Sequence, residues 1–150
     1  MLQAVVFKLA DEVYGVDIAA IEQIIELQRI TTVPHTPPYI AGLTNLRGTV
    51  LPVIDLRKRL ELPVKDPTRE MRIIVAQIRG ARVGMIVDTV TEVLHIPEAN
   101  VEPPSPLVTT IDSAYIIGIA KLSEEARSRE AGPLVVLVDL EQILPDVSTV

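Results

Sequence analysis

The chain has 150 residues, a hydrophobic fraction of 48% and a formal net charge of −6. Valine and isoleucine account for 37 of these residues, and such β-branched side chains favour strands. This length and composition suit one domain, or two small ones packed together, with a full hydrophobic core, and they exclude global disorder. Because the chain has no cysteine, disulfides, thiolate metal sites and a cysteine nucleophile are excluded as well.

Charge and hydropathy also restrict the partners and the location of the protein. Nucleic-acid binding needs a concentrated basic surface, whereas acidic residues outnumber basic ones here by 20 to 14. No apolar run reaches the ~18 residues of a membrane-spanning helix. The first residues, MLQAVVFKLADEV, lack the basic start and the cleavage site of a signal peptide. We therefore expect a cytoplasmic protein that binds no nucleic acid and does not insert into a membrane.

An internal repeat runs through the chain. Residues 5–9 match residues 74–78 at an offset of 69, and the same offset relates Gly15 to Gly84, Ile21 to Val90, Ile24 to Val93 and Ile25 to Leu94. Further on, residues 42–46 match 118–122, and residues 48–60 match 132–144 after an eight-residue insertion within the charged stretch 123–132. The common order of these blocks predicts a duplicated β fold with two lobes.

The first half begins with a hairpin of residues 4–9 and 13–16 around Asp11 and Glu12. Asp17 then predicts the start of a short helix over 17–26, because the isoleucines that follow have helical spacing. Residues 49–54 predict a central strand, with Pro52 limiting it to an edge or a bulge. Asp55 is expected to cap a single helical turn, and the proline-containing, charged residues 61–70 predict a linker.

The second half repeats this order. Residues 72–78 and 82–87 predict a hairpin around Gly80 and Ala81, and residues 97–106, with four prolines, predict an irregular passage. Residues 134–138 predict a second central strand, and Asp139 a second capped turn. We expect a single domain over residues 1–150, with one lobe over approximately 1–66 and the other over approximately 67–150.

No known catalytic or metal-binding motif is present. The sequence contains no GxSxG, GxxxxGK[ST], GxGxxG or HExxH pattern. His35 and His95 stand 60 residues apart, without metal-ligand spacing, and the five serines have no partnered histidine. The acidic residues form no close pair in an apolar surrounding, as acid–base catalysis would need. We therefore expect no catalytic residue, no metal and no cofactor.

Two positions stand out as candidates for binding a partner. Glu22 lies on the flank of the apolar stripe of the predicted helix, where it is either a boundary residue with a solvated head or a functional one. Residues 45–48 form a predicted turn in which Gly48 supplies the backbone conformation and Asn45 binds the turn backbone. Arg47 then projects from a rigid corner. Since the second half has Lys121 opposite Asn45 and no counterpart of the arginine, Arg47 points to function.

Over residues 3–144 the chain strongly resembles the CheW family of bacterial chemotaxis coupling proteins. The resemblance rests on YGVDIAAIEQIIE, ITTVPHTPPYIAGLTNLRGTVLPVIDLRKRL and VGMIVDTVTEVL, with NLRG followed by VLPVIDL as its most specific part. It implies a mainly β fold of two small five-stranded β-barrel lobes packed together, with a few short helices and no active site. It also implies an adaptor that bridges transmembrane chemoreceptors to the histidine kinase CheA, whose regulatory domain shares the fold.

The resemblance assigns residues to this role. Arg47 falls on the arginine of the family's NLRG motif and Glu22 on its glutamate, and both are expected on the receptor side. An apolar groove between the lobes is expected to receive the receptor's cytoplasmic hairpin tip. The receptor-binding residues implied are Glu22, Val33, Asn45, Arg47, Gly48, Val87, Val90 and Leu94. Turns and edge strands are expected to contact kinase regulatory domains, at receptor arrays on the inner face of the membrane.

One departure from the family pattern and two rival functions stay open. The charged insertion at 123–132 is longer than the turn that family members often have, which puts contacts near it in doubt. A rival function from another class is a small-barrel enzyme or ligand-binding domain that uses the cleft between the lobes. A nucleic-acid-binding barrel is a second rival, already weakened by the acidic charge.

Overall fold

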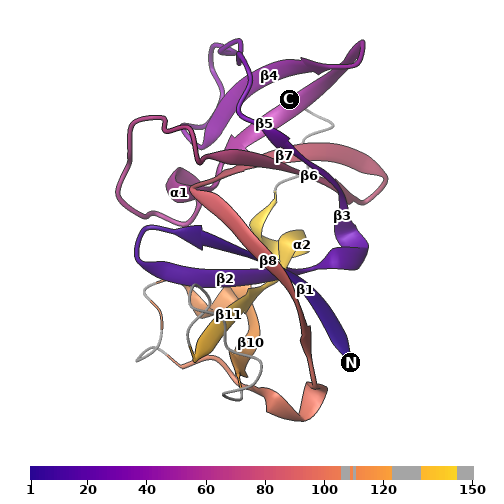
Figure 1. Cartoon of the computed structure of the whole chain (residues 1–150). Helices are drawn as coiled ribbons and strands as arrows, with labels where there is room; N and C mark the ends of the chain where they lie inside the picture. Colours follow the sequence, from indigo (N-terminus) through magenta and orange to yellow (C-terminus); the bar gives the residue numbers. More distant parts are fainter. Residues whose placement is uncertain (106–108, 110, 123–132, 145–150) are drawn as a thin grey trace.

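The computed structural model describes residues 1–105, 109, 111–122 and 133–144 and shows two stacked β-sheets with short helices between them (Figure 1). Sheet A has the strand order β8-β1-β2-β11-β10-β9, and sheet B has the order β3-β6-β7-β5-β4. The strands of sheet A are β1 (Leu2–Leu9), β2 (Glu12–Asp17), β8 (Thr89–Ile96), β9 (Val101–Glu102), β10 (Ile116–Lys121) and β11 (Leu134–Val138). Those of sheet B are β3 (Ile21–Glu26), β4 (Ile40–Leu46), β5 (Thr49–Asp55), β6 (Arg72–Ile78) and β7 (Ala81–Val87).

Helical segments within the described residues are short. Two α-helical turns follow the central strands, α1 (Leu56–Arg59) after β5 and α2 (Leu140–Ile143) after β11. Three 3₁₀ turns complete the chain, namely η1 (Ile18–Ala20), η2 (Glu98–Asn100) and η3 (Ser113–Tyr115). The prediction of a mainly β fold with two lobes and a few short helices is confirmed, with the two-residue β9 as a sixth strand in sheet A.

The two halves of the chain exchange hairpins. The β1–β2 hairpin belongs to the first half but lies in sheet A between strands of the second half, and the β6–β7 hairpin lies reciprocally in sheet B. The expected boundary near residue 66 therefore does not separate the two sheets. The first half of the chain cannot complete either sheet alone, because β3 pairs with β6 and β5 pairs with β7.

An approximate two-fold axis relates the halves, and the strand registers follow it residue by residue. Val6 pairs with Gly15 in one hairpin, and Val75 pairs with Gly84 in the other, at the offset of 69 found in the sequence. The parallel pairs agree too, since Val53 lies opposite Gly84 and Leu137 lies opposite Gly15. The repeat in the sequence is thus a repeat in the structure.

Strand alternation divides the core into three clusters. On β1, Val5 and Phe7 face a central cluster between the sheets, whereas Ala4 and Val6 face a cluster enclosed by sheet A. On β6, Ile74 likewise faces the central cluster, and its neighbours Ile73 and Val75 face a cluster enclosed by sheet B. Each sheet therefore curls around its own core, and the outer faces of both sheets share the central one.

The predicted helix over 17–26 is wrong. Asp17 does act as an N-cap, with its carboxylate accepting a hydrogen bond from Ala19 N at 2.9 Å, but it caps only η1. The next six residues, IEQIIE, form β3 and pair antiparallel with β6. Pairing with β6 completes backbone hydrogen bonds and lets Ile21 and Ile25 contact two different clusters, which a helix on one face does not allow. Helical spacing and strand alternation are hard to separate over so few isoleucines.

The other predicted strands and turns are present, but the passage over 97–106, predicted to be irregular, contains η2 and β9. Both hairpins form, and Asp55 and Asp139 cap α1 and α2 through bonds from Lys58 N (3.4 Å) and Glu141 N (3.0 Å). Pro52 lies in an interior strand, yet β5 begins its parallel pairing with β7 only at Val53. At Pro52 itself, β5 is paired with β4 but not yet with β7. The N–H that proline lacks is therefore not needed for a backbone hydrogen bond to β7.

A buried ion pair joins α1 to the junction between β7 and β8. Arg57 Nε donates to Asp88 Oδ1 at 2.8 Å and Arg57 Nη2 to Oδ2 at 2.5 Å, and both side chains are nearly nine-tenths buried. Asp88 also accepts from Ala10 N at 2.9 Å, and Arg57 donates to Pro63 O at 2.6 Å. The hydrogen bonds to Asp88 raise the pKa of Arg57 above its ordinary value, so this guanidinium stays charged.

Two arginines complete the C-terminal end of α2. The last four carbonyls of a helix have no intrahelical partner. Arg59 donates to Ile143 O at 2.5 Å and to Gln142 O at 3.4 Å, while Arg79 donates to Leu144 O at 3.3 Å and to Glu141 O. The Arg59 guanidinium also lies 4.8 Å from the ring centroid of Tyr39 and 5.4 Å from that of Tyr115, residues related by the two-fold axis. Arg59 therefore ties the two halves together near that axis.

A polar contact anchors the passage before η3 to β2. The Tyr14 hydroxyl donates to Glu12 Oε2, which also accepts from Thr109 Oγ1 at 3.0 Å. Burial, followed by the bond to Glu12, raises the pKa of Tyr14 above its ordinary value. The hydroxyl therefore remains a donor throughout the physiological range of pH.

We predict that Asp88→Ala lowers the free energy of unfolding by about 3 kcal/mol, because Arg57 then remains buried without its carboxylate. Urea melts measure the change. Glu102→Ala is the matched control, since Glu102 pairs with Lys121 at 2.7 Å but both side chains are more than half exposed. The control is expected to cost at most ~1 kcal/mol. Equal losses in the two variants would contradict a structural role for the buried pair.

Candidate protein-binding surface

The β4–β5 turn presents Arg47 on a fixed corner. Arg47 and Gly48 have φ values of 52° and 85°, so both occupy the left-handed region that a two-residue hairpin turn requires. Gly48 N donates to Asn45 Oδ1 at 2.7 Å, which confirms the predicted roles of Asn45 and Gly48 in this turn. Arg47 is exposed, and its guanidinium makes no hydrogen bond or ion pair with any residue that the structure describes. It is therefore available to a carboxylate or a carbonyl of a partner.

Glu22 pairs with a residue that the sequence did not indicate. Its carboxylate accepts from Arg82 Nε at 2.9 Å and from Arg82 Nη2 at 2.8 Å, a two-point ion pair between partly exposed side chains. The pairing of β3 with β6 shifts between Ile21 and Gln23, so Glu22 is the extra residue of a β-bulge. Bulges redirect side chains, which allows Glu22 to reach β7 across the intervening strand β6.

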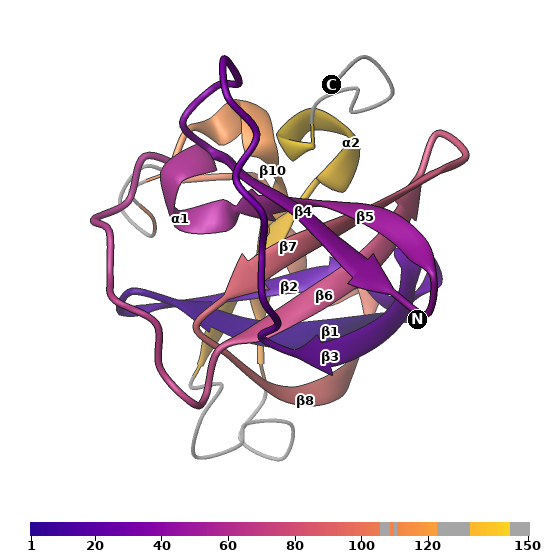
Figure 2. The same ribbon diagram turned by 90° about the horizontal axis from the view of Figure 1, so that it is seen from above.

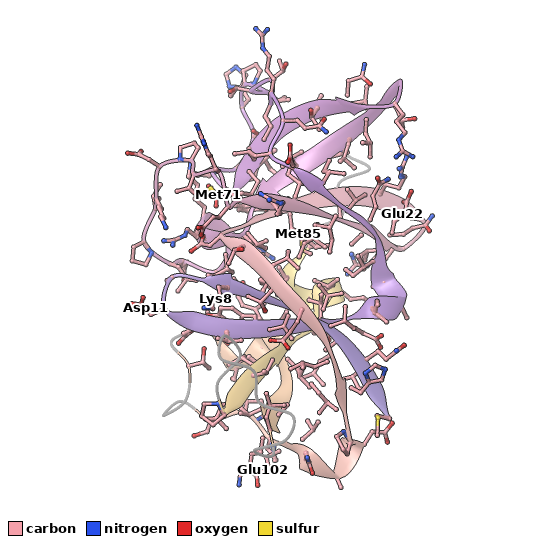
Figure 3. All side chains as sticks on the ribbon, in the orientation of Figure 1. Lys8, Asp11, Glu22, Met71, Met85 and Glu102 are labelled. Carbon is pink, nitrogen blue, oxygen red and sulfur yellow. The ribbon has the colours of Figure 1, made fainter. Side chains whose placement is uncertain are left out.

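Glu22 and Arg47 therefore belong to the same end of the molecule but not to one ion pair. Glu22 lies at the end of sheet B where the β6–β7 hairpin turns (Figure 3). The β4–β5 turn points to the same side in both ribbon views (Figures 1 and 2). Arg82, and not Arg47, compensates the charge of Glu22. Among the described residues, this end therefore presents the unpaired guanidinium of Arg47 beside the Glu22–Arg82 ion pair.

Apolar side chains are exposed on the edge strands β3 and β8. Both strands lie on one side of the molecule, β3 on sheet B and β8 on sheet A (Figures 1 and 2). Ile24 is 41% exposed and Val93 is 46% exposed, and the offset of 69 makes them equivalent residues. Their cross-strand partners, Ile74 and Val5, belong to the central cluster, so both face the space between the sheets.

Ile21 and Val90 extend this apolar surface inward. They too are equivalent residues, half-buried and packed against the central cluster. We call Ile21, Ile24, Val90 and Val93 the edge-strand surface. It connects the solvent directly with the largest hydrophobic cluster of the protein. Exposed aliphatic residues beside a buried cluster are typical of a surface that another protein covers.

The predicted groove residues do not gather at one place. Val90 lies on the edge-strand surface, but Val87 is fully buried in the central cluster and is not available to a partner. Leu94 is buried inside sheet A, because on β8 it alternates with the exposed Val93. Val33 is half-buried in the passage between β3 and β4. The expectation that Val87 and Leu94 line an accessible groove between the lobes is therefore wrong, because both side chains are buried.

A recess of about 600 Å³ lies beside the β4–β5 turn. Its lining includes Arg29, Asn45 and Val50, and Val50 is 65% exposed. Thr31 pairs with Leu43 along the free edge of β4, through two hydrogen bonds of 2.8 Å, and so covers part of that edge. The recess thus adjoins the corner that carries Arg47.

Sequence reasoning missed Ile24, Val93 and Arg82. The repeat had paired Ile24 with Val93. Because residues 17–26 were interpreted as a helix, however, the strand alternation that turns Ile24 toward the space between the sheets was not recognised. Nothing in the sequence links Glu22 to Arg82, which are 60 residues apart, because the bulge that joins them arises only on pairing with β6.

Neither a membrane-spanning helix nor a metal-binding group of side chains was found among the described residues. No helix there is long and apolar enough to cross a membrane. No group of three or more histidine and acidic side chains stands close enough to hold a metal ion in that part of the chain.

Known proteins resemble the chain over nearly its full length. The family model "CheW-like domain" matches residues 3–148. A "Probable chemotaxis protein CheW" of Rhizobium etli is 30% identical over 147 residues, covering 98% of this chain and 90% of its own. "Chemotaxis protein CheW" of Bacillus subtilis is 43% identical over 98 residues, covering 65% of this chain and 63% of its own.

A solved structure confirms the fold. The crystal structure of the scaffolding protein TtCheW from Thermoanaerobacter tengcongensis superposes with a TM-score of 0.80 at 41% identity, over 93% of this chain and 89% of that one. The relatives that match are named as chemotaxis proteins, and this structure as that of a scaffolding protein. With a family model over almost every residue and a close structural match, the chain belongs to the CheW-like domain family of chemotaxis proteins.

Proposed function

We propose that the protein is a non-enzymatic adaptor that couples transmembrane chemoreceptors to a CheA-type histidine kinase. The edge-strand surface is the observation that carries this proposal. This exposed apolar surface supports protein binding rather than catalysis, and so does membership of a family whose members are named for chemotaxis and scaffolding. The adaptor works in the cytoplasm, at receptor arrays on the inner face of the membrane.

The receptor's cytoplasmic hairpin tip occupies the edge-strand surface in this proposal. An amphipathic helix presents apolar side chains at spacings of three and four residues, and these pack well on an exposed aliphatic surface with polar flanks. Ile24 and Val93 supply the aliphatic contacts, one from each sheet. Arg47, without a partner among the described residues, binds a carboxylate or a helix-terminal carbonyl of the tip. Both sheets then contact a single receptor hairpin.

The kinase regulatory domain binds elsewhere on the same molecule. The edges of the sheets at β4 and β9 lie at the ends opposite to β3 and β8 in the strand orders, and outer edge strands are common sites of association with another protein. Separate faces for receptor and kinase allow both to be bound together. The two sheets share the central cluster. A change in their relative position, caused by one partner, therefore also changes the surface that binds the other partner.

We predict that Arg47→Glu lowers the affinity for a receptor hairpin fragment by at least about thirtyfold (about 2 kcal/mol) and leaves the affinity for the kinase regulatory domain unchanged. Arginine is a frequent hot-spot residue, and the substitution reverses its charge. Isothermal titration calorimetry with each partner measures both affinities.

Lys65→Glu is the matched control for this charge reversal. Lys65 is exposed in the linker between α1 and β6, away from the β4–β5 turn, so neither affinity is expected to change. If Arg47→Glu abolished kinase binding and spared the receptor, the two faces would be reversed.

Neighbouring residues on β8 test the edge-strand surface. We predict that Val93→Asp leaves the urea melt nearly unchanged, because Val93 is 46% exposed, but lowers receptor affinity at least about tenfold. Leu94→Asp is expected to lower the free energy of unfolding by about 3 kcal/mol or more, because Leu94 is 9% exposed and the new charge is unpaired. Unchanged receptor binding by folded Val93→Asp would remove the edge-strand surface from the proposal.

A further inference from the structure

The approximate two-fold axis relates two places in the molecule, and an ion pair present at one of them is not repeated at the other. At the first place, Arg57 of α1 binds Asp88, the residue that follows β7, and the pair fills the space beside the β1–β2 turn. The equivalent of Asp88 is Ala19 after β2, and the equivalent of Arg57 is Glu141 of α2. The residues that form the ion pair are thus not repeated at the equivalent place.

A cavity of about 390 Å³ occupies this equivalent place. It lies where η1, the β6–β7 hairpin, β10 and α2 meet. Ala19 and Glu141 line it, together with the apolar side chains of Ile78, Ile117 and Leu140. Ile117 is 59% exposed at the rim and is the extra residue of a bulge in β10, where the register shifts between Ile116 and Gly118. The cavity has an apolar wall and an open mouth.

The charges around the cavity favour a cation. The Glu141 carboxylate makes no hydrogen bond or ion pair with any described residue, and Asp17 and Asp139 add two further carboxylates to the lining. Arg79 is the opposing charge in the lining, but its two terminal nitrogens already donate to the carbonyls of Leu144 and Glu141. A cationic ligand therefore meets three carboxylates, two of which also cap η1 and α2, against the single positive charge of Arg79.

The first half of the molecule shows which cation such a space accepts. There the Arg57 side chain is nearly nine-tenths buried, with its guanidinium on the Asp88 carboxylate and on Pro63 O. A planar guanidinium binds several acceptors at once, which an ammonium group does not do with the same geometry. We propose that the cavity beside Glu141 binds an arginine side chain of a protein partner, with its stem on Ile78, Ile117 and Leu140 and its guanidinium on Glu141.

This second docking point is independent of the edge-strand surface. It is built by α2 and η1 and includes neither Arg47 nor the exposed residues of β3 and β8. A partner that inserts an arginine there contacts both sheets, because Ile78 belongs to sheet B and Ile117 to sheet A. It therefore holds the two sheets together in the second half, as Arg57 does in the first.

The first experiment supplies the arginine from the chain itself. Glu141→Arg and Ala19→Asp place in the cavity the same two residue types that form the buried pair in the first half. If an arginine fits, the double variant melts at least about 2 °C above the sum of the single effects. Glu141→Met with Ala19→Asp is the matched control, since methionine fills the cavity without a guanidinium and is expected to show no such gain. Additive melting temperatures in the arginine variant would overturn the proposal.

The second experiment tests a free ligand on the full chain. N-acetyl-arginine amide is titrated into uniformly ¹⁵N-labelled protein, and the amide shifts of Ala19 and Ile117 are followed. We expect saturable shifts with a Kd at least about fivefold lower than that of N-acetyl-citrulline amide, which has nearly the same shape but no charge. The shifts are expected to disappear in Glu141→Arg, whose own side chain fills the cavity. Equal affinity for the two amides, or shifts that persist in this variant, would show that the cavity does not select a guanidinium.

Discussion

The exchange of hairpins between the two halves is the constraint on which the rest of the structure depends. Each half of the chain supplies a hairpin that completes the sheet of the other, so that neither sheet, nor the central cluster between them, is complete until both halves have met. The long-range pairings β1–β8 and β3–β6 enforce this arrangement. Folding is therefore expected to be cooperative over the whole chain, with the linker at 61–70 as a connection and not as a boundary between independent units.

The same exchange explains why the binding surface lies where it does. The axis that relates the halves places one edge strand of each sheet, β3 and β8, on one side of the molecule. Equivalent residues at the two edges are aliphatic, and the pair Ile24 and Val93 remains in contact with solvent. Duplication thus creates two matching apolar edges above a shared core, a surface that neither half could form alone.

The two halves differ most clearly in polar residues that depart from the two-fold symmetry. Arg47 has no counterpart within the described residues, and the bulge residue Glu22, paired with Arg82, is equivalent to Thr91, whose hydroxyl donates to Val6 O at 3.3 Å. The buried Arg57–Asp88 pair is equivalent to an open cavity at Glu141 and Ala19. At the first of these places Arg57 is buried in an ion pair, whereas at the second the carboxylate of Glu141 faces an open cavity. A symmetric scaffold with asymmetric polar residues thus has distinct faces, to which our proposal assigns different partners.

The sequence by itself determined the elements that local chemistry specifies. The two hairpins, the caps at Asp55 and Asp139 and the Asn45–Gly48 turn depend on neighbouring residues, and the duplication was visible as a fixed offset. Tertiary structure decided the rest. Residues 21–26 form a strand because β6, some 50 residues further along the chain, completes their backbone hydrogen bonds. Glu22 binds Arg82, and Leu94 is buried while Val93 is exposed, because pairing across the sheet fixes the face of each side chain and no local pattern carries that information.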